Sequence, residues 1–321
     1  MVSIIIVSWN AKAYLLKLLA SLANETYPRE IIVVDNDSSD GSPEAIARDY
    51  PEVKLIRSPE NLGFSRANNL GIKAATGEYL AFVNSDVEVF PGCIPGLVAF
   101  SEAHPRVGVA GPALFGGKGG LQRSYWGFPT LRNRFARAFA LDNFFPAKTF
   151  SGFSTYGAKE AFKPVDVLQG SFLLVKRAAL ETVGPWDEGF FLYGEDVDWC
   201  KRFWKGGWEV MYVSSSRAIH YGGSSSANAP VRFYVERAKA DLQYWLKHKT
   251  FVDVWAYILI SLVHESLRVL GYSVFAPFKS SARYKAKRGI ASIRWLLSSE
   301  SSSEKLTVNP LSIKIENTAQ K

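Results

Sequence analysis

Cysteine is scarce in this chain, whose 321 residues include only Cys93 and Cys200. Two cysteines so far apart give neither a disulfide framework nor the close spacing of a zinc knuckle, so we expect reduced thiols in a reducing compartment. The N-terminal run MVSIIIVSWN also lacks the basic segment and the small-residue cleavage site of a signal peptide. We therefore expect this run to be a first β-strand.

Two common nucleotide-binding fingerprints are missing as well. The sequence contains no G-x-G-x-x-G motif and no G-x-x-x-x-G-K-[ST] motif. A nucleotide bound by this chain must therefore be held by a different motif. The hydrophobic fraction of 47% and the charged fraction of 21% are those of a globular protein rather than a disordered one.

Acidic residues are absent from Ser266 to Ser299, in a chain whose net charge is +8. The basic residues of that window are Arg268, Lys279, Arg283, Lys285, Lys287, Arg288 and Arg294. A segment of this kind favours an anionic membrane surface or a nucleic acid, and a plain solvated helix face is the alternative. Because Trp, Tyr and Phe are interleaved with the basic residues, we expect a peripheral membrane contact and no nucleic acid.

The main apolar stretch of the C-terminal part runs from Phe251 to Phe278. Its longest run without a charge, Val254 to Val263, is shorter than the ~20 residues of a membrane-spanning helix. A helix that lies in the membrane interface fits this pattern. A helix pair that packs on the rest of the protein, at a homodimer contact for example, fits it nearly as well.

The first ninety residues alternate between short β-branched runs and segments of helical periodicity. The expected strands are Ser3–Ser8, Ile31–Val34, Val53–Arg57 and Tyr79–Val83, and the expected helices are Ala13–Leu22, Pro43–Asp49 and Ser65–Ala75. This alternation predicts an α/β fold with a mostly parallel sheet flanked by helices. Further strands are expected at Val165–Val175, which Gly170 interrupts, and at Val210–Val213.

Polar residues follow two of these strands directly. Asn84, Ser85 and Asp86 come after Tyr79–Val83, and Asp35 ends the second strand. Ligands in open α/β sheets lie just beyond the carboxyl ends of strands, where Asp35 could accept hydrogen bonds from a ribose or a base. If the chain stays extended, Asp86 and Glu88 point to the same side and could hold a hard cation carrying a phosphate. Turn formation and helix capping are the alternatives at both places.

The densest polar and aromatic cluster lies between Gly184 and Trp199. Glu195 and Asp196 fall in the first turn of an expected helix, where the helix dipole alone favours carboxylates. That alternative accounts for one acid more easily than for the whole run. Farther along, His220 directly precedes a Gly/Ser loop, and imidazole can join carboxylates around a borderline metal ion.

Five segments of the chain stand in a fixed order. They read SIIIVSWN, VVDNDSSDGS, NLGFSRANNLGIKAATGEYLAFVNSD, QGSFLLVKRAALETVGPWDEGFFLYGEDVDWCKRFWKGGW and IHYGGSS. Together they span about residues 3 to 226 and resemble the motifs of the family 2 glycosyltransferases, most closely the rhamnosyltransferase-like branch. One such motif is a weak signal, and five in order are a strong one. The resemblance implies the GT-A fold and an inverting transfer from a nucleotide-sugar.

The resemblance also implies roles for individual residues. The residues expected to bind the donor are Ser8, Trp9, Asp35, Asn36, Asn61, Asn84, Ser85 and Asp86. Asn84-Ser85-Asp86 corresponds to the family's DXD motif, in which Asn84 replaces the first Asp. Asp86 is therefore the main carboxylate ligand expected for Mg²⁺ or Mn²⁺, with His220 completing the metal shell.

Catalysis and acceptor binding are expected in the later cluster. Asp196 matches the catalytic base of the family and ranks above its neighbour Glu195, while Trp186, Asp187 and Glu188 match an acceptor-binding segment. The base would take the proton of the attacking hydroxyl, and a divalent ion would neutralise the leaving diphosphate. One direct displacement of this kind inverts the anomeric configuration.

These expectations divide the chain into a GT-A catalytic domain, residues 1–226, and a C-terminal helical region, residues 227–321. The expected donor is dTDP-rhamnose, and the expected acceptor is a glycan or a polyprenyl-linked sugar, reached from the cytoplasm at the inner face of the cell membrane. The same fold acting on a UDP-sugar, and a protein that binds nucleotide-sugars or carbohydrates without turnover, are the alternatives.

Overall fold

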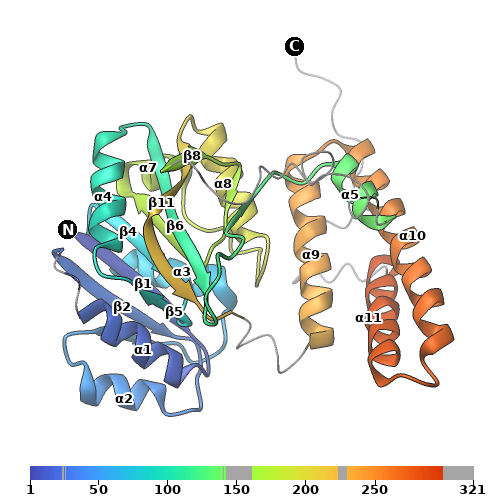
Figure 1. The fold of residues 1–321 in the computed structure, drawn as a ribbon, viewed down its shortest axis with the longest axis horizontal. Coiled ribbons are helices and arrows are strands. Elements are labelled where there is room, and N and C mark those ends of the chain that lie inside the picture. Colours follow the sequence, from blue (N-terminus) through green and yellow to red (C-terminus); the bar gives the residue numbers. More distant parts are fainter. Residues whose placement is uncertain (24, 26, 140, 142–160, 223–229, 299–321) are drawn as a thin grey trace. The chain divides into compact units, whose positions relative to one another are not determined.

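The computed structural model describes residues 1–23, 25, 27–139, 141, 161–222 and 230–298. The chain forms two compact units (Figure 1). The sheet unit comprises Met1–Pro129 and Asp142–Asn228, and the helical unit comprises Thr130–Leu141 and Ala229–Lys321. The division expected at residue 226 does not foresee the Thr130–Leu141 segment, which packs with the C-terminal helices although it lies in the middle of the sequence.

The sheet unit is built on a large mixed sheet. Its strands are β1 (Val2–Ser8), β2 (Arg29–Asp35), β3 (Lys54–Arg57), β4 (Tyr79–Val83), β5 (Val87–Val89), β6 (Val107–Gly116), β8 (Phe162–Pro164), β10 (Phe172–Lys176) and β11 (Glu209–His220). They run in the order β3-β2-β1-β4-β10-β6-β11-β5, and β8 pairs with β11. Strands β1 to β4 pair in parallel, as does β6 with β11, whereas β10 is antiparallel to both of its neighbours. A second, two-stranded sheet joins β7 (Tyr125–Trp126) to β9 (Val167–Leu168).

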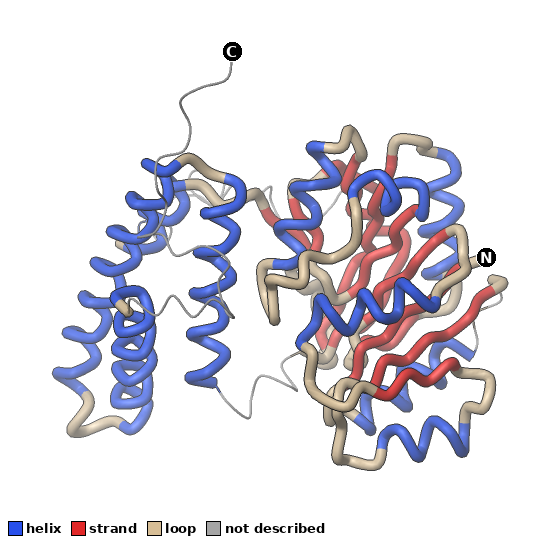
Figure 2. The backbone as a smooth tube through the Cα atoms, turned by 180° about the vertical axis from the view of Figure 1, so that it is seen from behind, coloured by secondary structure: helices blue, strands red, loops and turns tan. Residues whose placement is uncertain are grey.

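Helices cover both faces of the large sheet (Figure 2). The side chains of Ile4 and Ile6 enter the core on the face covered by α1 (Lys12–Ala23), α2 (Ser42–Asp49) and α4 (Cys93–Ala103). Ile5 enters the core on the opposite face, with α3 (Gly63–Ala74), α7 (Arg177–Val183) and α8 (Glu195–Lys205). Both faces are therefore apolar, which is why β1 reads as an unbroken β-branched run rather than an alternating one.

The predicted strands and helices of the first ninety residues are confirmed to within two residues at each end. The single strand predicted at Val165–Val175 is wrong in one respect, because Gln169–Ser171 separates β9 from β10. The chain leaves the small sheet there and enters the large one, so the apolar run serves two different ladders. Val210–Val213 is the start of a longer strand, β11, with a register shift between Val213 and Arg217.

The helical unit contains α5 (Leu131–Ala138), α9 (Pro230–His248), α10 (Phe251–Phe275) and α11 (Ser280–Leu297). Thr250 caps α10 through a capping box, in which its hydroxyl accepts from the Asp253 N–H while the Asp253 carboxylate accepts from the Thr250 N–H. Trp245 of α9 stacks on Tyr257 of α10 with ring centroids 5.0 Å apart. By length and composition, α10 is the described helix able to cross a membrane. This differs from the expectation drawn from its charge-free run.

Candidate active site

The carboxyl ends of β1 and β2 lie side by side, because Ser8 and Asp35 are register partners. The Asn36 N–H donates to the Ser8 carbonyl oxygen at 2.8 Å, and one Asp35 oxygen, Oδ2, accepts from the Ser38 N–H at 3.2 Å. The other oxygen, Oδ1, and the Ser8 hydroxyl are buried without a partner among the described residues. Buried polar atoms are normally hydrogen-bonded, so these two indicate a place where a polar ligand binds.

The loops that follow β1 and β2 are joined to each other. The Asn10 N–H donates to the Ser38 hydroxyl at 3.0 Å, and the Asn10 side-chain oxygen accepts from the Ser39 N–H at 2.8 Å. Asn10 and Asp37 adopt positive φ angles of 50° and 68°, which are uncommon outside glycine. Strained backbone of this kind persists where the surroundings fix it and is frequent at functional sites.

Hydrogen bonds to Asp40 also join these two loops. Its carboxylate accepts from the Lys12 N–H at 2.8 Å and from both the N–H and the hydroxyl of Ser42, at 3.0 and 2.6 Å. Burial raises the pKa of Asp40, but these hydrogen bonds outweigh it and hold the pKa below its ordinary value. The ionised side chain therefore stabilises the loop geometry.

Asn36 and Asn61 bind each other. The Asn36 side-chain amide donates to the Asn61 side-chain oxygen at 3.0 Å and to the Gly63 carbonyl oxygen at 3.1 Å, and its own oxygen accepts from the Leu62 N–H at 2.8 Å. These contacts fix the chain just before α3. A direct donor contact from either side chain stays a prediction, since both Asn36 amide hydrogens already have acceptors.

The turn after β4 carries Asn84, Ser85 and Asp86, and the last two are buried. Backbone hydrogen bonds fix it on both sides: the Asn84 N–H donates to the Ser171 carbonyl oxygen, and the Tyr221 N–H donates to the Asp86 carbonyl oxygen, both at 2.9 Å. The turn is therefore held between the start of β10 and the end of β11.

His220 lies beside Asp86. The antiparallel pairing of β5 with β11 sets His220 opposite Val87, and Nε2 of His220 lies 3.4 Å from Oδ1 of Asp86. Each of these two side chains is 10% exposed. Residues 134 positions apart in the sequence thus form one buried pair, as expected.

Gln122 determines which nitrogen of His220 carries the hydrogen. The Gln122 amide nitrogen donates to the His220 carbonyl oxygen at 2.6 Å, which directs the Gln122 oxygen to His220 Nδ1 at 3.1 Å. Nδ1 must then be the donor, so Nε2 of the neutral ring is an acceptor that faces the Asp86 carboxylate. An imidazole nitrogen and a carboxylate oxygen 3.4 Å apart are ligand types that a borderline divalent cation accepts together. Nothing in the sequence singles out Gln122 for this contact.

The Asp86–His220 pair fits a divalent ion that is completed by a ligand. Among the described residues, no third His, Cys, Asp or Glu joins the pair. Glu88 does not join it, contrary to the expectation, because its carboxylate accepts from the Tyr221 hydroxyl at 2.7 Å. Hard cations such as Mg²⁺ commonly bind one or two protein carboxylates and take their remaining ligands from phosphates and water.

Asp196 is connected to the turn that carries Asp86 through two consecutive residues, Gly170 and Ser171. The Gly170 N–H donates to Asp196 Oδ2 at 3.0 Å, and the next residue, Ser171, accepts from the Asn84 N–H. The Val197 N–H donates to Asp196 Oδ1 at 2.8 Å. The turn that carries Asp86 and the first turn of α8 therefore meet at Gly170–Ser171. The Ser171 hydroxyl is buried there without a described partner.

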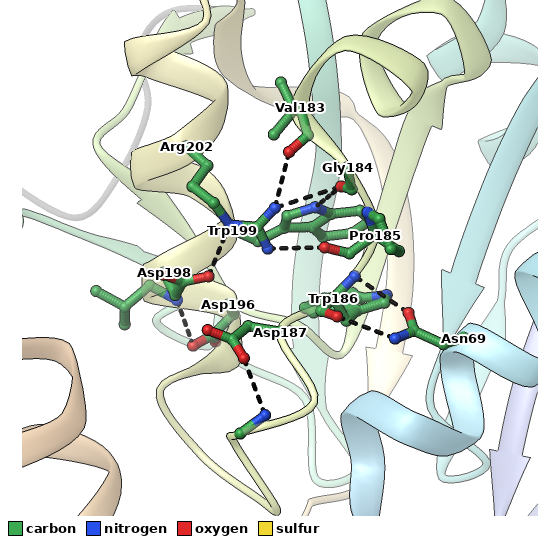
Figure 3. A network of polar contacts seen from close by, with 12 residues as sticks. Asn69, Val183, Gly184, Pro185, Trp186, Asp187, Asp196, Asp198, Trp199 and Arg202 are labelled. Atoms are coloured by element: carbon green, nitrogen blue, oxygen red, sulfur yellow. Dashed lines mark hydrogen bonds and ion pairs between the residues drawn. The ribbon is translucent and has the colours of Figure 1, made fainter. Parts of the chain in front are cut away.

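Two further acids of α8 differ from Asp196 in their surroundings. Glu195 and Asp198 are buried, whereas Asp196 is half-buried. Asp198 accepts from Arg202 Nε at 2.8 Å, and the Arg202 guanidinium also donates to the carbonyl oxygens of the Val183–Pro185 stretch (Figure 3). Asp198 and Arg202 therefore hold the loop that precedes the acceptor segment, a role the sequence does not reveal.

The acceptor segment is attached to α3 by Asn69. The Asn69 side chain accepts from the Trp186 N–H at 3.1 Å and donates to the Trp186 carbonyl oxygen at 2.9 Å (Figure 3). It also donates to Glu188 Oε1 at 3.0 Å. The Trp186 ring is 2% exposed. Its ring neighbours are Phe64, Phe82 and Trp199. We therefore correct the expected role of Trp186: its ring is a core side chain, while Asp187 and Glu188 remain the polar part of the segment.

Comparison with known proteins agrees with this geometry. Residues 3–184 match the family model described as Glycosyl transferase family 2. The chain belongs to the family 2 glycosyltransferases. This glycosyltransferase is 32% identical over 241 residues to an N-acetylglucosaminyl-diphospho-decaprenol L-rhamnosyltransferase of Mycobacterium tuberculosis, across 71% of this chain and 78% of the relative. It is 29% identical over 232 residues to the rhamnosyltransferase WbbL of Escherichia coli K12, across 69% and 83% of the two chains.

The fold of the glycosyltransferase is also similar to solved structures. Mannosyltransferase PcManGT from Pyrobaculum calidifontis, solved in complex with GDP-Man and Mn²⁺, superimposes with a TM-score of 0.54 at 16% identity, over 93% of this chain and 88% of that one. The predicted GT-A fold, with a central sheet flanked by helices and a C-terminal helical part, is confirmed. The sheet is mixed rather than mostly parallel, because β10 pairs antiparallel with β4 and β6, and β11 pairs antiparallel with β5 and β8. The chain is thus a family 2 glycosyltransferase of the rhamnosyltransferase-like branch.

Proposed function

We propose that this glycosyltransferase moves an L-rhamnosyl residue from dTDP-rhamnose to a polyprenyl-diphosphate-linked sugar, with inversion at the anomeric carbon. The observation that carries the proposal is that the turn carrying Asp86, which lies beside His220, and the Asp196 carboxylate are bound to the consecutive residues Ser171 and Gly170. A site for the leaving diphosphate and a proton acceptor thus share one short piece of backbone. The likeness to the mycobacterial L-rhamnosyltransferase supports the choice of donor and acceptor.

The nucleotide of the donor is proposed to bind at the ends of β1 and β2. Asp35 Oδ1 and the Ser8 hydroxyl supply two buried polar atoms that lack partners, and Trp9 follows Ser8 directly. A carboxylate there accepts hydrogen bonds from ribose hydroxyls or a base N–H. Asn36 and Asn61 shape the neighbouring loop.

Asp86 and His220 are proposed to hold Mg²⁺ or Mn²⁺ together with the donor diphosphate. When bound, such an ion acts as a Lewis acid that stabilises the charge of the leaving group. The tautomer imposed by Gln122 presents Nε2 of His220 as a ligand atom. Asn84, which stands in place of a first Asp, contributes its backbone to the turn.

Asp196 is proposed as the general base. Two backbone N–H groups orient its carboxylate, and the side chain is partly exposed. As the hydroxyl oxygen forms a bond to the anomeric carbon, its proton passes to Asp196, and the bond from that carbon to the diphosphate oxygen breaks with its electron pair on dTDP. Positioned proton transfer of this kind contributes typically ~10²–10⁴-fold in rate. Asp187 and Glu188 are proposed to contact the acceptor.

A polyprenyl-linked acceptor places the enzyme at the inner face of the cell membrane, and we propose peripheral contact there from the cytoplasmic side. The test of the function uses purified protein with Mn²⁺, a short-chain polyprenyl diphosphate-linked N-acetylglucosamine, and either dTDP-rhamnose or a set of UDP-sugars. We expect rhamnosyl transfer with inversion, read from the anomeric coupling in the product. Transfer from a UDP-sugar alone would overturn the donor, and binding of every donor without any product would overturn the activity.

A further inference from the structure

One face of α10 is apolar and exposed along its whole length. Val252, Leu259, Leu270 and Val274 are 74%, 64%, 66% and 67% exposed. We call the apolar stripe the set Val252, Trp255, Leu259, Val263, Leu267, Leu270 and Val274, all of which are exposed. Their spacing of three or four residues keeps them within an arc of roughly 120° on a helix with 3.6 residues per turn.

The opposite face of α10 is already occupied. Val254, Tyr257, Ile258, Ser261 and Glu265 are its buried residues. Arg134 of α5 donates to the Ser261 hydroxyl at 2.9 Å, and Glu265 bonds the Tyr234 hydroxyl of α9. These contacts fix the rotation of the helix. The apolar stripe therefore points away from the other described helices of its own unit.

The helix that packs along α10 carries one sign of charge. From Ser280 to Leu297, α11 contains no acidic residue, and its basic residues Arg283, Lys285, Lys287 and Arg294 are exposed. A pocket of about 270 Å³ lies where α10 ends and α11 begins, lined by Tyr272, Phe275, Lys279, Ser281, Ala282 and Lys285. An apolar stripe beside several cations complements an anionic lipid surface, where apolar side chains enter the acyl boundary and ammonium and guanidinium groups meet phosphates.

A position within the interface fits α10 better than a position across the bilayer. A spanning α10 would carry into the hydrocarbon its neighbours α9 and α11, whose Lys and Arg side chains are costly there. It would also carry the cluster of Glu265, Arg268 and Tyr234 to mid-membrane depth. A helix lying flat needs only its stripe to enter the lipid.

We propose that the apolar stripe of α10 and the exposed basic residues of α11 form a docking surface for anionic phospholipids, with α10 parallel to the membrane plane. About 33 Å of helix, from Val252 to Val274 at 1.5 Å per residue, contacts the lipid. The assignment rests on the exposed residues of the helical unit and needs neither the donor nor the acceptor proposed above.

Vesicle binding tests the docking surface without any turnover. The purified full chain is sedimented with vesicles of phosphatidylcholine alone, or with added phosphatidylglycerol, at low and high salt. We expect binding that requires phosphatidylglycerol and weakens with salt. Leu259→Glu or Leu270→Glu should weaken it about tenfold or more. Reversing both Arg283 and Lys287 to Glu should weaken it on the order of 25-fold, about fivefold for each cation.

Matched variants in the sheet unit provide the controls. Phe90→Glu changes an apolar residue that is 38% exposed, and the pair Lys73→Glu and Lys118→Glu changes the net charge as much as the reversal in α11. Both should bind vesicles like the parent, and thermal unfolding should show every variant folded. Equal losses in control and test variants, or no vesicle binding by the parent, would overturn the proposal. A dimer that Leu259→Glu dissociates, in a protein that ignores vesicles, would assign the stripe to a second copy instead.

Discussion

The backbone N–H of Gly170 donates to Oδ2 of Asp196 at 3.0 Å. The next residue, Ser171, accepts from the Asn84 N–H in the turn that carries Asp86, so the proposed base and this turn are bound to neighbouring residues. Asp196 is at the start of α8, whereas Gly170 lies between β9 and β10. The break between these strands thus has a use. A continuous strand would direct its N–H groups into a ladder, while the break frees one for the carboxylate.

Replacing Asp196 with Asn should remove the base and keep the size of the side chain, with its amide oxygen still able to accept from one of the two N–H groups, of Gly170 or Val197. We expect turnover to fall ~10²–10⁴-fold, with donor affinity nearly unchanged, because the diphosphate is bound elsewhere. Steady-state rates and calorimetric titration of the donor measure the two effects separately. Glu195→Gln is the matched control and should stay within about tenfold of the parent. A larger loss at Glu195 than at Asp196 would exchange their roles.

Asp86 and His220 should act as one unit in metal-dependent donor binding. Asp86→Ala or His220→Ala should weaken donor binding in the presence of Mn²⁺, and a chelator should weaken binding by the parent but add little to either variant. Because the two residues share one ion, the double variant should lose about as much as each single variant. Additive losses, or parent binding indifferent to the chelator, would separate the pair from the metal.

Much of the fold can be predicted from short-range pattern alone. The strand ending at Val83 is bounded by Gly77 and by the polar Asn84, and these boundaries are visible in the sequence. The long strand β6 (Val107–Gly116) escapes prediction, because Gly108, Gly111 and Pro112 interrupt its apolar run. It lies inside the sheet all the same, between β10 and β11. Side chains at Gly108 and Gly111 would meet those of Trp208, Ala179 and Leu168, so the two glycines serve packing.

A site residue can be predicted from the sequence only where its own type and its position at the end of a strand or the start of a helix indicate its function. Asp86 and Asp196 stand at a strand end and a helix start, so the sequence identifies them. Gln122 and Asn69 act through partners 98 and 117 positions away, and no local pattern encodes such contacts. Trp186 is the opposite case, a residue predicted to bind the acceptor whose ring lies in the core. Its sequence neighbours are polar, but its ring is covered by aromatic residues from α3, β4 and α8.

Gly63 should tolerate no side chain. Its φ is +78°, and an added Cβ would lie 2.5 Å from the Phe191 carbonyl oxygen, which accepts from the Phe64 N–H. Gly63→Ala should therefore lower the free energy of unfolding by about 2 kcal/mol or more, as measured by chemical denaturation. Gly271→Ala, in the last turns of α10 where an added Cβ would meet nothing within 4 Å, should instead be neutral or stabilise by up to about 1 kcal/mol.

Stability should depend on pH through Asp40. Because its pKa is held below the ordinary value, its contribution is present above about pH 4 and is lost as the pH falls through the folded-state pKa. Asp40→Asn places an amide nitrogen against the N–H groups of Lys12 or Ser42 and should cost about 1–2 kcal/mol at pH 7. The difference from the parent should shrink toward pH 3 in denaturation curves. Asp49→Asn, which removes an exposed carboxylate, should cause no measurable change at either pH.

Asn69 should position the acceptor segment without touching either substrate. It binds the main chain of Trp186 on both sides and also Glu188, whose other oxygen lies 3.7 Å from Arg66 Nε. Asn69→Ala releases this attachment, so we expect the acceptor KM to rise by about tenfold, while the donor affinity stays within twofold of the parent, as roughly 1–2 kcal/mol of hydrogen bonding is lost.

The neighbouring Asn68 provides the matched control for Asn69. Its side chain makes a single hydrogen bond within α3, to the Phe64 carbonyl oxygen at 3.0 Å. Asn68→Ala should therefore leave the acceptor KM unchanged even where it lowers stability. If both variants raised the acceptor KM alike, α3 as a whole would be the support. If Asn69→Ala reduced donor affinity instead, the segment that follows Trp186 would belong to the donor site. The comparison shows this because Asn69 binds that segment, whereas Asn68 bonds only within α3.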